Sequence, residues 1–393
     1  MEYMDKLKLV RSQMEGNGLH AYIIFHSDPH ISEYIPEYWK IREWVSGFNG
    51  SAGTLVVTTS KVAIWLDSRY FLQAEQQLAG TGIEICKMGL PGTPDIISWL
   101  SQALEKGSTV GFDGLLVSLN TARTYIDSLK ENGFLCNPII DLVSKLWVDR
   151  PALPDGKVFI HEMEFARVTV AGKLAAIREK MRDRKATSYL MCSLDEICWT
   201  FNIRGSDILY NPVVTSYAFV DDKDAILFVD RGKLEPDVFD RLIDLGVTVK
   251  DYPEVFKFAA ELDKKNILAI DPAKTNYVVY THIPSRVKVV ETAGIAAEIK
   301  THKSSEVVDG IRQAMVQDGI AMVEFLYWLD RNVGDTEITE LSVGDKLLEL
   351  RRKQQYFVSE SFNPIVAMPT MVPLYITVHR PKLIIPLKTA VFC

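Results

Sequence analysis

The stretch Lys-Leu-Lys-Leu-Val-Arg-Ser-Gln-Met at residues 6–14 recurs at residues 173–181 as Lys-Leu-Ala-Ala-Ile-Arg-Glu-Lys-Met. At the same offset, Ala-Tyr-Ile-Ile at residues 21–24 corresponds to Ser-Tyr-Leu-Met at residues 188–191. Each copy has the apolar spacing of an amphipathic helix that leads into a short apolar strand. The sequence therefore contains an internal repeat of one α/β unit.

The order of predicted elements beyond these helices is also shared. Residues 53–65 predict a strand, a turn and a second strand, and residues 215–229 repeat that pattern around Asp-Asp-Lys-Asp. Each half then predicts another strand, a helix and a short strand that ends at an aspartate, Asp113 or Asp271. Strands mixed with helices in this order indicate sheets covered by helices. The predicted fold class is α/β, with two tandem domains that contain mixed sheets.

Composition marks the domain boundaries. Residues 148–156 combine prolines, a glycine and charges, as a linker does, so we place a first domain at 1–150 and a second at 157–300. A long amphipathic helix follows, with apolar residues at helical spacing from Val308 through Met315 and Met322 to Leu329. Another helix is expected to begin near Thr339. Residues 301–366 are interpreted as the incomplete start of a third domain.

The overall composition excludes several classes of protein. Apolar residues make up 47%, charged residues 24%, and the net charge of -7 argues against a nucleic-acid surface. No segment reaches the roughly 18 apolar residues of a membrane span, and the charged N-terminus lacks the apolar core of a signal peptide. Five scattered cysteines are typical of reduced thiols. We therefore expect a cytoplasmic protein with no membrane and no nucleic-acid partner.

Metal-ligating and nucleophilic motifs are missing from the sequence. None of the seven histidines forms H-E-x-x-H or a Cys/His cluster, and no G-x-S-x-G elbow is present. His26 and His30 flank Pro29 after an apolar strand, so a loop or domain-contact role is favoured over a metal site. The glycine-rich residues 46–53 precede a strand and not a helix, which favours a tight turn over a phosphate loop. No retained catalytic residue and no metal ligand can be assigned.

Arg69 is the one candidate for substrate contact. The residues Asp67-Ser68-Arg69-Tyr70 close the first predicted hairpin. An arginine beside a tyrosine at a strand end can recognise a carboxylate or a carbonyl. The competing interpretation is an ordinary surface ion pair.

Several stretches together resemble the cytosolic long form of the Xaa-Pro aminopeptidases (aminopeptidase P), in the creatinase/prolidase-like metallopeptidase family. The stretches that carry the resemblance are Val45–Thr54, Asp67–Ala74, Leu146–Pro151, Leu194–Ile197, Asn202–Ile208, Asn211–Val213, Glu337–Glu340, Arg351–Gln354 and Phe357–Phe362. They extend over three segments in the family's order, to about Val366.

The resemblance implies two creatinase-type N-terminal domains followed by a "pita-bread" metallopeptidase domain. It implies release of the N-terminal residue from peptides with proline in second position, by two divalent metal ions, usually manganese, in a homodimer. It also implies that Arg69 lies near the substrate. None of the family's five metal ligands has a matching position here, so the 393-residue chain is expected to be inactive and to hold no metal.

The last residues depart from the family pattern. After Phe-Asn-Pro-Ile-Val at residues 362–366, the family continues with a glycine-rich stretch and a His-Tyr pair. Read from the third base of each codon, residues 372–377 can encode Gly-Ala-Ile-Val-His-Tyr. We therefore expect residues 367–393 to be an out-of-frame tail produced by a one-base frameshift. Coding DNA that lacks the family's sequence in every frame would contradict this.

Two other interpretations remain open. The two front domains can form a non-catalytic protein for dimerisation or peptide binding. A creatinase-type amidinohydrolase shares the architecture and works without metal, although the linker and Phe-Val-Ser-Glu-Ser-Phe at residues 357–362 resemble the aminopeptidase branch.

Overall fold

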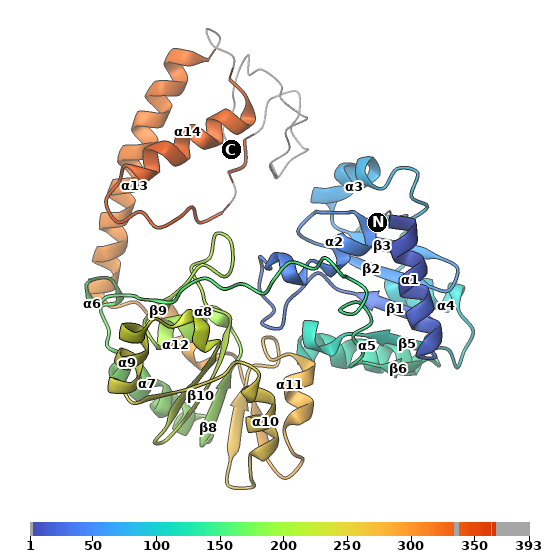
Figure 1. Ribbon diagram of the computed structural model, residues 1–393, viewed down its shortest axis with the longest axis horizontal. Helices are drawn as coiled ribbons and strands as arrows, with labels where there is room; N and C mark the ends of the chain where they lie inside the picture. The colour runs from blue at the N-terminus through green and yellow to red at the C-terminus, as the bar shows by residue number, and fades with distance from the viewer. Residues whose placement is uncertain (1–2, 334–337, 363, 367–393) are drawn as a thin grey trace. The chain divides into compact units, whose positions relative to one another are not determined.

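The computed structural model describes residues 3–333, 338–362 and 364–366 (Figure 1). The chain divides into two compact units, residues 1–302 and 303–393. Each unit is described by itself below. The predicted tail, residues 367–393, lies outside the described residues.

The first half of unit 1 is built on one six-stranded sheet in the order β4-β3-β2-β1-β5-β6. β1 runs parallel to β5 and antiparallel to β2, and β2 runs antiparallel to β3. Its elements are α1 (Tyr3–Gly16), β1 (Ala21–Ile24), η1 (Glu37–Trp39), α2 (Ile41–Ser46), β2 (Thr54–Thr58), β3 (Val62–Leu66), η2 (Ser68–Tyr70), α3 (Phe71–Gln77), β4 (Glu84–Lys87), α4 (Ile96–Ala103), β5 (Thr109–Phe112), η3 (Gly114–Leu116), α5 (Leu119–Glu131) and β6 (Leu135–Asn137).

The second half carries a sheet of the same topology in the order β12-β11-β10-β8-β13-β14, and a two-stranded sheet β7-β9. Its elements are β7 (Phe159–Ile160), α6 (Met163–Ala166), α7 (Val170–Asp183), β8 (Ser188–Met191), α8 (Leu194–Thr200), β9 (Ile203–Arg204), β10 (Ser216–Asp221), β11 (Ala225–Val229), η4 (Arg231–Lys233), α9 (Pro236–Asp244), β12 (Val247–Lys250), α10 (Glu254–Glu261), β13 (Ile267–Ile270), α11 (Tyr277–His282), β14 (Lys288–Glu291) and α12 (Ile295–Thr301).

The predicted repeat is confirmed. α1 and α7 are both 14 residues long, and the bounds of α1 and β1 coincide with those of α7 and β8 at the offset read from the sequence. Both predicted hairpins form, and the strands β5 and β13 end immediately before Asp113 and Asp271. The α/β fold class with two tandem domains is therefore correct.

One arginine contact is repeated in both copies. Arg11 Nε donates to the carbonyl of Thr58 at 2.9 Å, at the turn between β2 and β3. Arg178 Nε donates to the carbonyl of Asp221 at 2.7 Å, at the turn between β10 and β11. The first helix of each copy is thus bonded to the equivalent hairpin of its own sheet. This contact is a physical reason for an arginine at this position in both halves of the repeat.

A lysine contact is also repeated. Lys6 Nζ donates to the carbonyl of Trp44 at 2.9 Å and lies 5.0 Å from its ring centroid. Lys173 Nζ donates to the carbonyl of Trp199 at 2.7 Å and lies 4.5 Å from that ring. Each ammonium group thus lies over the tryptophan ring of a short helix, α2 or α8, and donates to a carbonyl of that helix. Both contacts are favourable for a positive charge.

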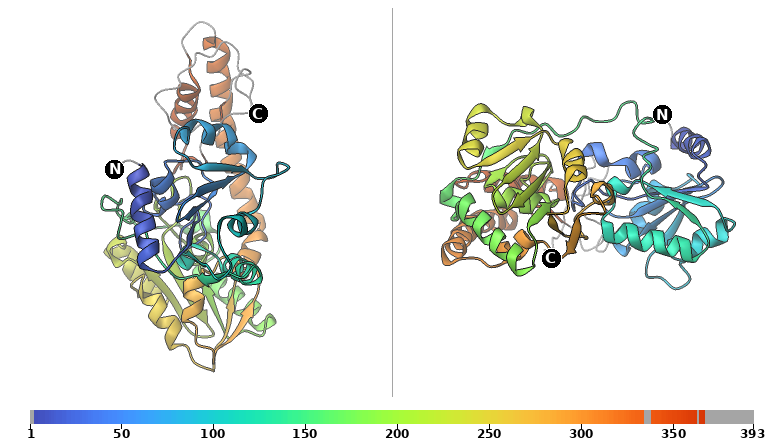
Figure 2. Two further views of the ribbon diagram at one scale, coloured as in Figure 1. Left: turned by 90° about the vertical axis from the view of Figure 1, so that its right-hand side faces the viewer. Right: turned by 90° about the horizontal axis from the view of Figure 1, so that it is seen from below.

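Helices cover both faces of each sheet, as Figures 1 and 2 show. In the second half, α7, α8, α9 and α12 pack on one face and α10 and α11 on the other. Polar side chains cap the helices that enclose these cores, which satisfies amide groups that would otherwise have no partner. The capping residues include Asp95 of α4, Ser118 of α5, Thr169 of α7 and Asn276 of α11.

The two halves of unit 1 meet through a reciprocal backbone contact. The amide of Leu119 donates to the carbonyl of Thr275 at 2.8 Å, and the amide of Tyr277 donates to the carbonyl of Val117 at 2.9 Å. These residues flank the capping positions of α5 and α11, which are equivalent helices of the repeat. The same two turns therefore present the same groups to each other from both sides.

Unit 2 contains α13 (Ser305–Asn332) and α14 (Glu340–Arg352), which pack on one another. α14 begins directly after Thr339, close to the predicted start, and Thr339 caps it in a capping box with Ser342. The predicted long helix is confirmed: of its apolar residues, Ala321, Phe325 and Leu329 are buried against α14, whereas Met315 is 63% exposed. The apolar face of α13 is wider than the strip that α14 covers, so part of that face stays exposed.

Candidate functional site

Three segments that carry polar groups meet at one edge of the first sheet. Because β1 and β3 both run antiparallel to β2, their carboxyl ends lie where β2 begins. Residues 25–30 follow β1, residues 67–70 follow β3, and the glycine-rich residues 46–53 lead into β2. Loops at the carboxyl ends of parallel strands are the usual place for binding groups in α/β sheets.

A buried arginine organises the glycine-rich loop. Arg42 is completely buried, and its guanidinium donates to the carbonyls of Gly50 and Gly53, the latter at 3.3 Å. Burial lowers the pKa of Arg42 to about 10. Because this value is still well above 7, the guanidinium is charged at neutral pH. A Cβ on Gly50 would lie 2.3 Å from the ring of Phe48, so only glycine fits there.

The prediction of a tight turn at residues 46–53 is therefore wrong in detail. Gly47, with φ +76°, ends α2 in the left-handed conformation, and the remaining residues form an open loop around Arg42. The side-chain oxygen of Asn49 accepts from Gln73 at 2.7 Å and from Gln77 at 2.8 Å, which ties the loop to α3. Sequence reasoning missed Arg42, whose signal is a cation three residues before the buried Val45 in an otherwise apolar helix face.

Arg69 lies at the same edge and forms a bidentate ion pair. Its Nε and Nη2 donate to the two carboxylate oxygens of Asp67, each at 2.8 Å. The hydrogen bond from Arg69 lowers the pKa of Asp67. The Arg69 side chain stays 56% exposed, with its guanidinium 5.2 Å from the ring centroid of Tyr70. The surface ion pair considered from the sequence exists, and the guanidinium retains N–H groups that can face a ligand.

The two histidines after β1 have different surroundings. His30 is buried, its Nδ1 lies 2.8 Å from the carbonyl of Cys192 and its Nε2 lies 2.9 Å from the hydroxyl of Tyr252. Both ring nitrogens are thus used, and the predicted domain-contact role of His30 is confirmed. Burial, followed by the charges of Arg42 and Lys40, lowers the pKa of His26 to about 3, so its ring is neutral.

The residues described by the structure do not fit a pair of metal ions. Among residues 3–333, 338–362 and 364–366, no group of three or more His, Cys, Asp or Glu side chains is placed to hold a metal. Within the same ranges, no helix is long and apolar enough to cross a bilayer. Cys192 and Cys198 are buried among apolar residues, and burial raises the pKa of both thiols to about 12.

Comparisons with protein families match both halves of unit 1. Residues 6–141 and residues 149–306 each match a creatinase/prolidase N-terminal domain. Aminopeptidase P2 of Arabidopsis thaliana is 32% identical over 92% of this chain and 56% of its own length. A probable Xaa-Pro aminopeptidase P of Paracoccidioides brasiliensis is 33% identical over 93% of this chain and 62% of its own length. The chain thus spans about six-tenths of the relatives it matches.

A solved structure gives the same result for the fold. The X-prolyl aminopeptidase of Caenorhabditis elegans, described as a cytosolic enzyme with a di-nuclear active site, superposes with a TM-score of 0.88 at 30% identity. The match covers 93% of this chain and 62% of the worm protein.

Proposed function

The chain is a homologue of the Xaa-Pro aminopeptidases and contains two creatinase/prolidase N-terminal domains. We propose that its function is the removal of the N-terminal residue from peptides that have proline in the second position. The superposition with the worm enzyme over 93% of this chain carries this proposal. According to this proposal, the described residues recognise the peptide but do not catalyse its hydrolysis. The proposal extends to the family's two divalent metal ions, manganese by preference, a homodimer and a cytoplasmic location.

The 393-residue chain, taken alone, is proposed to be catalytically silent. The support is that its described residues offer no donor set for two metals, and hydrolysis by this family needs metal-activated water. We expect no release of the first residue from a proline-second tripeptide above the buffer blank, with or without added Mn²⁺. The measurement is chromatographic detection of the released amino acid. Metal-dependent turnover that a chelator abolishes would contradict the proposal.

A non-catalytic role in dimerisation or peptide binding is the second candidate. The observation that favours it is the connection between the two halves of unit 1 through the backbone of Leu119 and Tyr277 and the buried side chain of His30. Peptide binding by the purified chain without turnover fits this role. Turnover by any preparation of the 393-residue chain argues against it.

Arg69 is proposed to contact the substrate. Its half-exposed guanidinium, held in place by Asp67, can donate to a peptide carbonyl at the sheet edge. Arg69→Ala is expected to weaken binding of a proline-second tripeptide about tenfold, the value of one hydrogen bond to a charged group. Isothermal titration of the 393-residue chain measures this.

Arg241→Ala is the matched control for that titration. Arg241 forms a bidentate pair with Glu162 at the surface of the second half of unit 1, with both contacts at 3.0 Å and side chains 44% and 55% exposed. We expect its removal to leave peptide affinity unchanged. Equal losses in the two variants would show that Arg69 acts only through general charge.

A further inference from the structure

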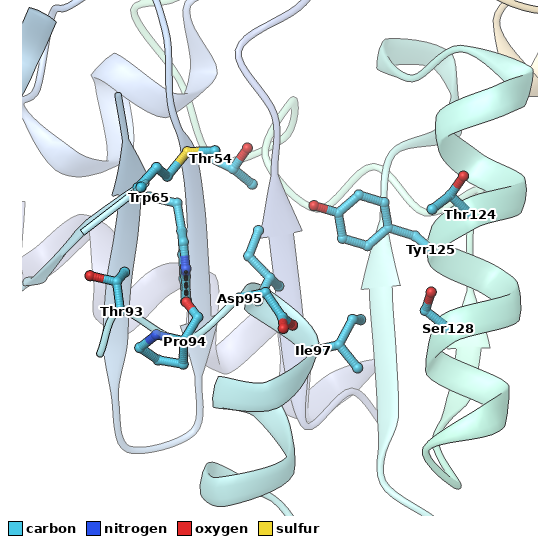
Figure 3. A pocket seen from close by; sticks show the side chains of 12 residues that line it. Thr54, Trp65, Thr93, Pro94, Asp95, Ile97, Thr124, Tyr125 and Ser128 are labelled. Atoms are coloured by element: carbon cyan, nitrogen blue, oxygen red, sulfur yellow. Dashed lines mark hydrogen bonds between the residues drawn. The ribbon is translucent and has the colours of Figure 1, made fainter. Parts of the chain in front are cut away.

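The first half of unit 1 has a cavity of about 410 Å³ on one face of its sheet, and Arg69 is not among the residues that line it. Figure 3 shows its walls: Trp65 of β3, the segment before α4, and Tyr125 of α5. Thr54 at the start of β2 and Met88 after β4 complete the lining. A volume of this size is in the range that holds small organic ligands.

The internal repeat identifies the counterpart of this cavity. Ile24 pairs with Leu55 in the first sheet, and its equivalent Met191 pairs with Ala218 in the second, so Thr54 corresponds to Tyr217. By the same register Trp65 corresponds to Phe228, because Thr54 pairs with Trp65 and Tyr217 with Phe228.

The edge strands β4 and β12, which pair with β3 and β11, extend this comparison. Trp65 pairs with Cys86, and Phe228 pairs with Lys250. Met88 therefore corresponds to Tyr252, since Met88 lies two residues after Cys86 in the chain and Tyr252 lies two residues after Lys250. Two large rings of the second half, Tyr217 and Tyr252, thus stand where the first half has a threonine and a methionine.

In the second half an aromatic ring from elsewhere in the chain packs against these two tyrosines. The imidazole of His30 lies 4.5 Å from the ring centroid of Tyr217 and 5.8 Å from that of Tyr252. Its Nε2 is 2.9 Å from the Tyr252 hydroxyl. The repeated fold therefore holds aromatic rings at this point of the sheet in the second half, where the smaller Thr54 and the flexible Met88 leave an open cavity in the first half.

The open position has one hydroxyl aimed into it. The ring of Tyr125 is fixed edge-on by Phe25 at 5.2 Å and packs on Phe112 at 6.4 Å. Its hydroxyl points from α5 toward the cavity and makes no hydrogen bond within the part of the chain that the structure describes (Figure 3). Burial raises the pKa of Tyr125 to about 12, so the hydroxyl keeps its proton and can donate. The indole N–H of Trp65 is already used by the carbonyl of Pro94, at 2.8 Å.

The charge around the cavity limits the ligand further. Asp95 is the charged residue among those that line it, and no lysine, arginine or histidine does so. A carboxylate or phosphate would enter beside a negative group without a compensating cation, which is unfavourable. Neutral or cationic molecules meet no such penalty.

We propose that this cavity binds a small aromatic ring, neutral or cationic, that carries a hydrogen-bond acceptor for the Tyr125 hydroxyl. Arg69 is not among the residues that line this site, and the ligand would occupy the space that the ring of Tyr217 fills in the second half.

Ligand-observed NMR titration of the 393-residue chain tests the proposal with three matched probes. Benzimidazole carries a ring nitrogen acceptor, indole has the same shape without one, and benzimidazole-5-carboxylate adds a negative charge. We expect a Kd of about 1 mM for benzimidazole, as a well-fitted fragment of nine heavy atoms allows. Indole should bind about threefold weaker and the carboxylate at least about tenfold weaker.

Variants separate this site from unspecific binding. Thr54→Tyr copies the second half of the repeat and should abolish benzimidazole binding by filling the cavity, whereas Thr54→Val keeps the volume and should bind as the parent chain does. Tyr125→Phe should remove the preference for benzimidazole over indole. If Thr54→Tyr fails to fold by circular dichroism, Ile97→Phe narrows the cavity from α4 and carries the same expectation.

Three results would overturn the proposal. They are no saturable binding of benzimidazole up to about 10 mM, equal binding by the parent chain and the filled variants, and tighter binding of the carboxylate than of benzimidazole.

Discussion

Replacing Lys233 with methionine is expected to lower the free energy of unfolding of unit 1 by about 3–5 kcal/mol. Lys233 Nζ lies 2.6 Å from an oxygen of Asp207, and the side chains of the pair are 4% and 0% exposed. The same oxygen accepts the amide of Thr215 at 2.6 Å. Removal of the lysine leaves a carboxylate without a countercharge in the interior, which costs more than the pair itself contributes.

Urea denaturation followed by far-UV circular dichroism measures this loss. Lys157→Met is the matched control, because the Lys157–Glu235 pair has side chains that are 60% and 52% exposed. Pairs of that kind contribute little, so the control should change stability by about 0.5 kcal/mol or less. The double variant Lys233→Met with Asp207→Leu should recover much of the loss. A Lys233→Met chain as stable as the control would refute the expectation.

Replacing Asp113 with asparagine is expected to remove a pH dependence from the stability of unit 1. Burial, and then the nearby charge of Asp141, raises the pKa of Asp113 from 3.8 to about 7. Its carboxylate oxygen accepts the amide of Leu115 at 2.9 Å, a bond that an asparagine oxygen can also accept. The substitution therefore keeps the turn after β5 and removes only the titration.

The sign of this dependence follows from proton linkage. Between pH 4 and 7 the folded chain binds the Asp113 proton more tightly than the unfolded chain does, so stability falls as pH rises. The contribution is fully present below pH 4 and is lost as pH passes through 7. A shift of this size corresponds to up to about 4 kcal/mol between the two limits.

Thermal unfolding of the parent and Asp113→Asn chains at several pH values from 4 to 8 measures the effect. The stability of the parent relative to Asp113→Asn should be highest near pH 4 and should fall as pH rises through 7. Asp95→Asn provides a control that does not titrate in this range: hydrogen bonds from Ser98 lower the pKa of Asp95 below its usual 3.8, so its contribution is lost only at lower pH and its profile from pH 4 to 8 should parallel that of the parent. Identical pH profiles for the parent and Asp113→Asn would contradict the assignment.

The repeat made most of the fold predictable from the sequence. A helix such as Tyr3–Gly16 and a strand such as Ala21–Ile24 are specified by local apolar spacing, and the second copy confirms each assignment. The caps at Thr339 and Ser118 are equally local signals. Such elements depend on neighbouring residues, so the sequence carries them directly.

The binding features were less predictable because they depend on contacts between distant residues. Arg42 is fixed by the carbonyls of Gly50 and Gly53, which follow it in the chain, and its own segment carries only the signal of a cation in an otherwise apolar helix face. The cavity beside Trp65 arises from the small size of Thr54, which is visible only once the strand registers of the two halves are known. Arg69 could be named from the sequence, but its role as a substrate contact stays a prediction.

The reciprocal contact between the turns before α5 and α11 has the geometry of an isologous homodimer, in which each partner presents the same patch to the other. Here both partners belong to one polypeptide. The connecting segment converts what would be a bimolecular association into an intramolecular one, so the pairing does not depend on protein concentration. That segment has only to span the distance, and residues 151–158 accordingly contain neither helix nor strand. A substitution in either turn changes the contact that both turns form, so the two turns are expected to be under selection together.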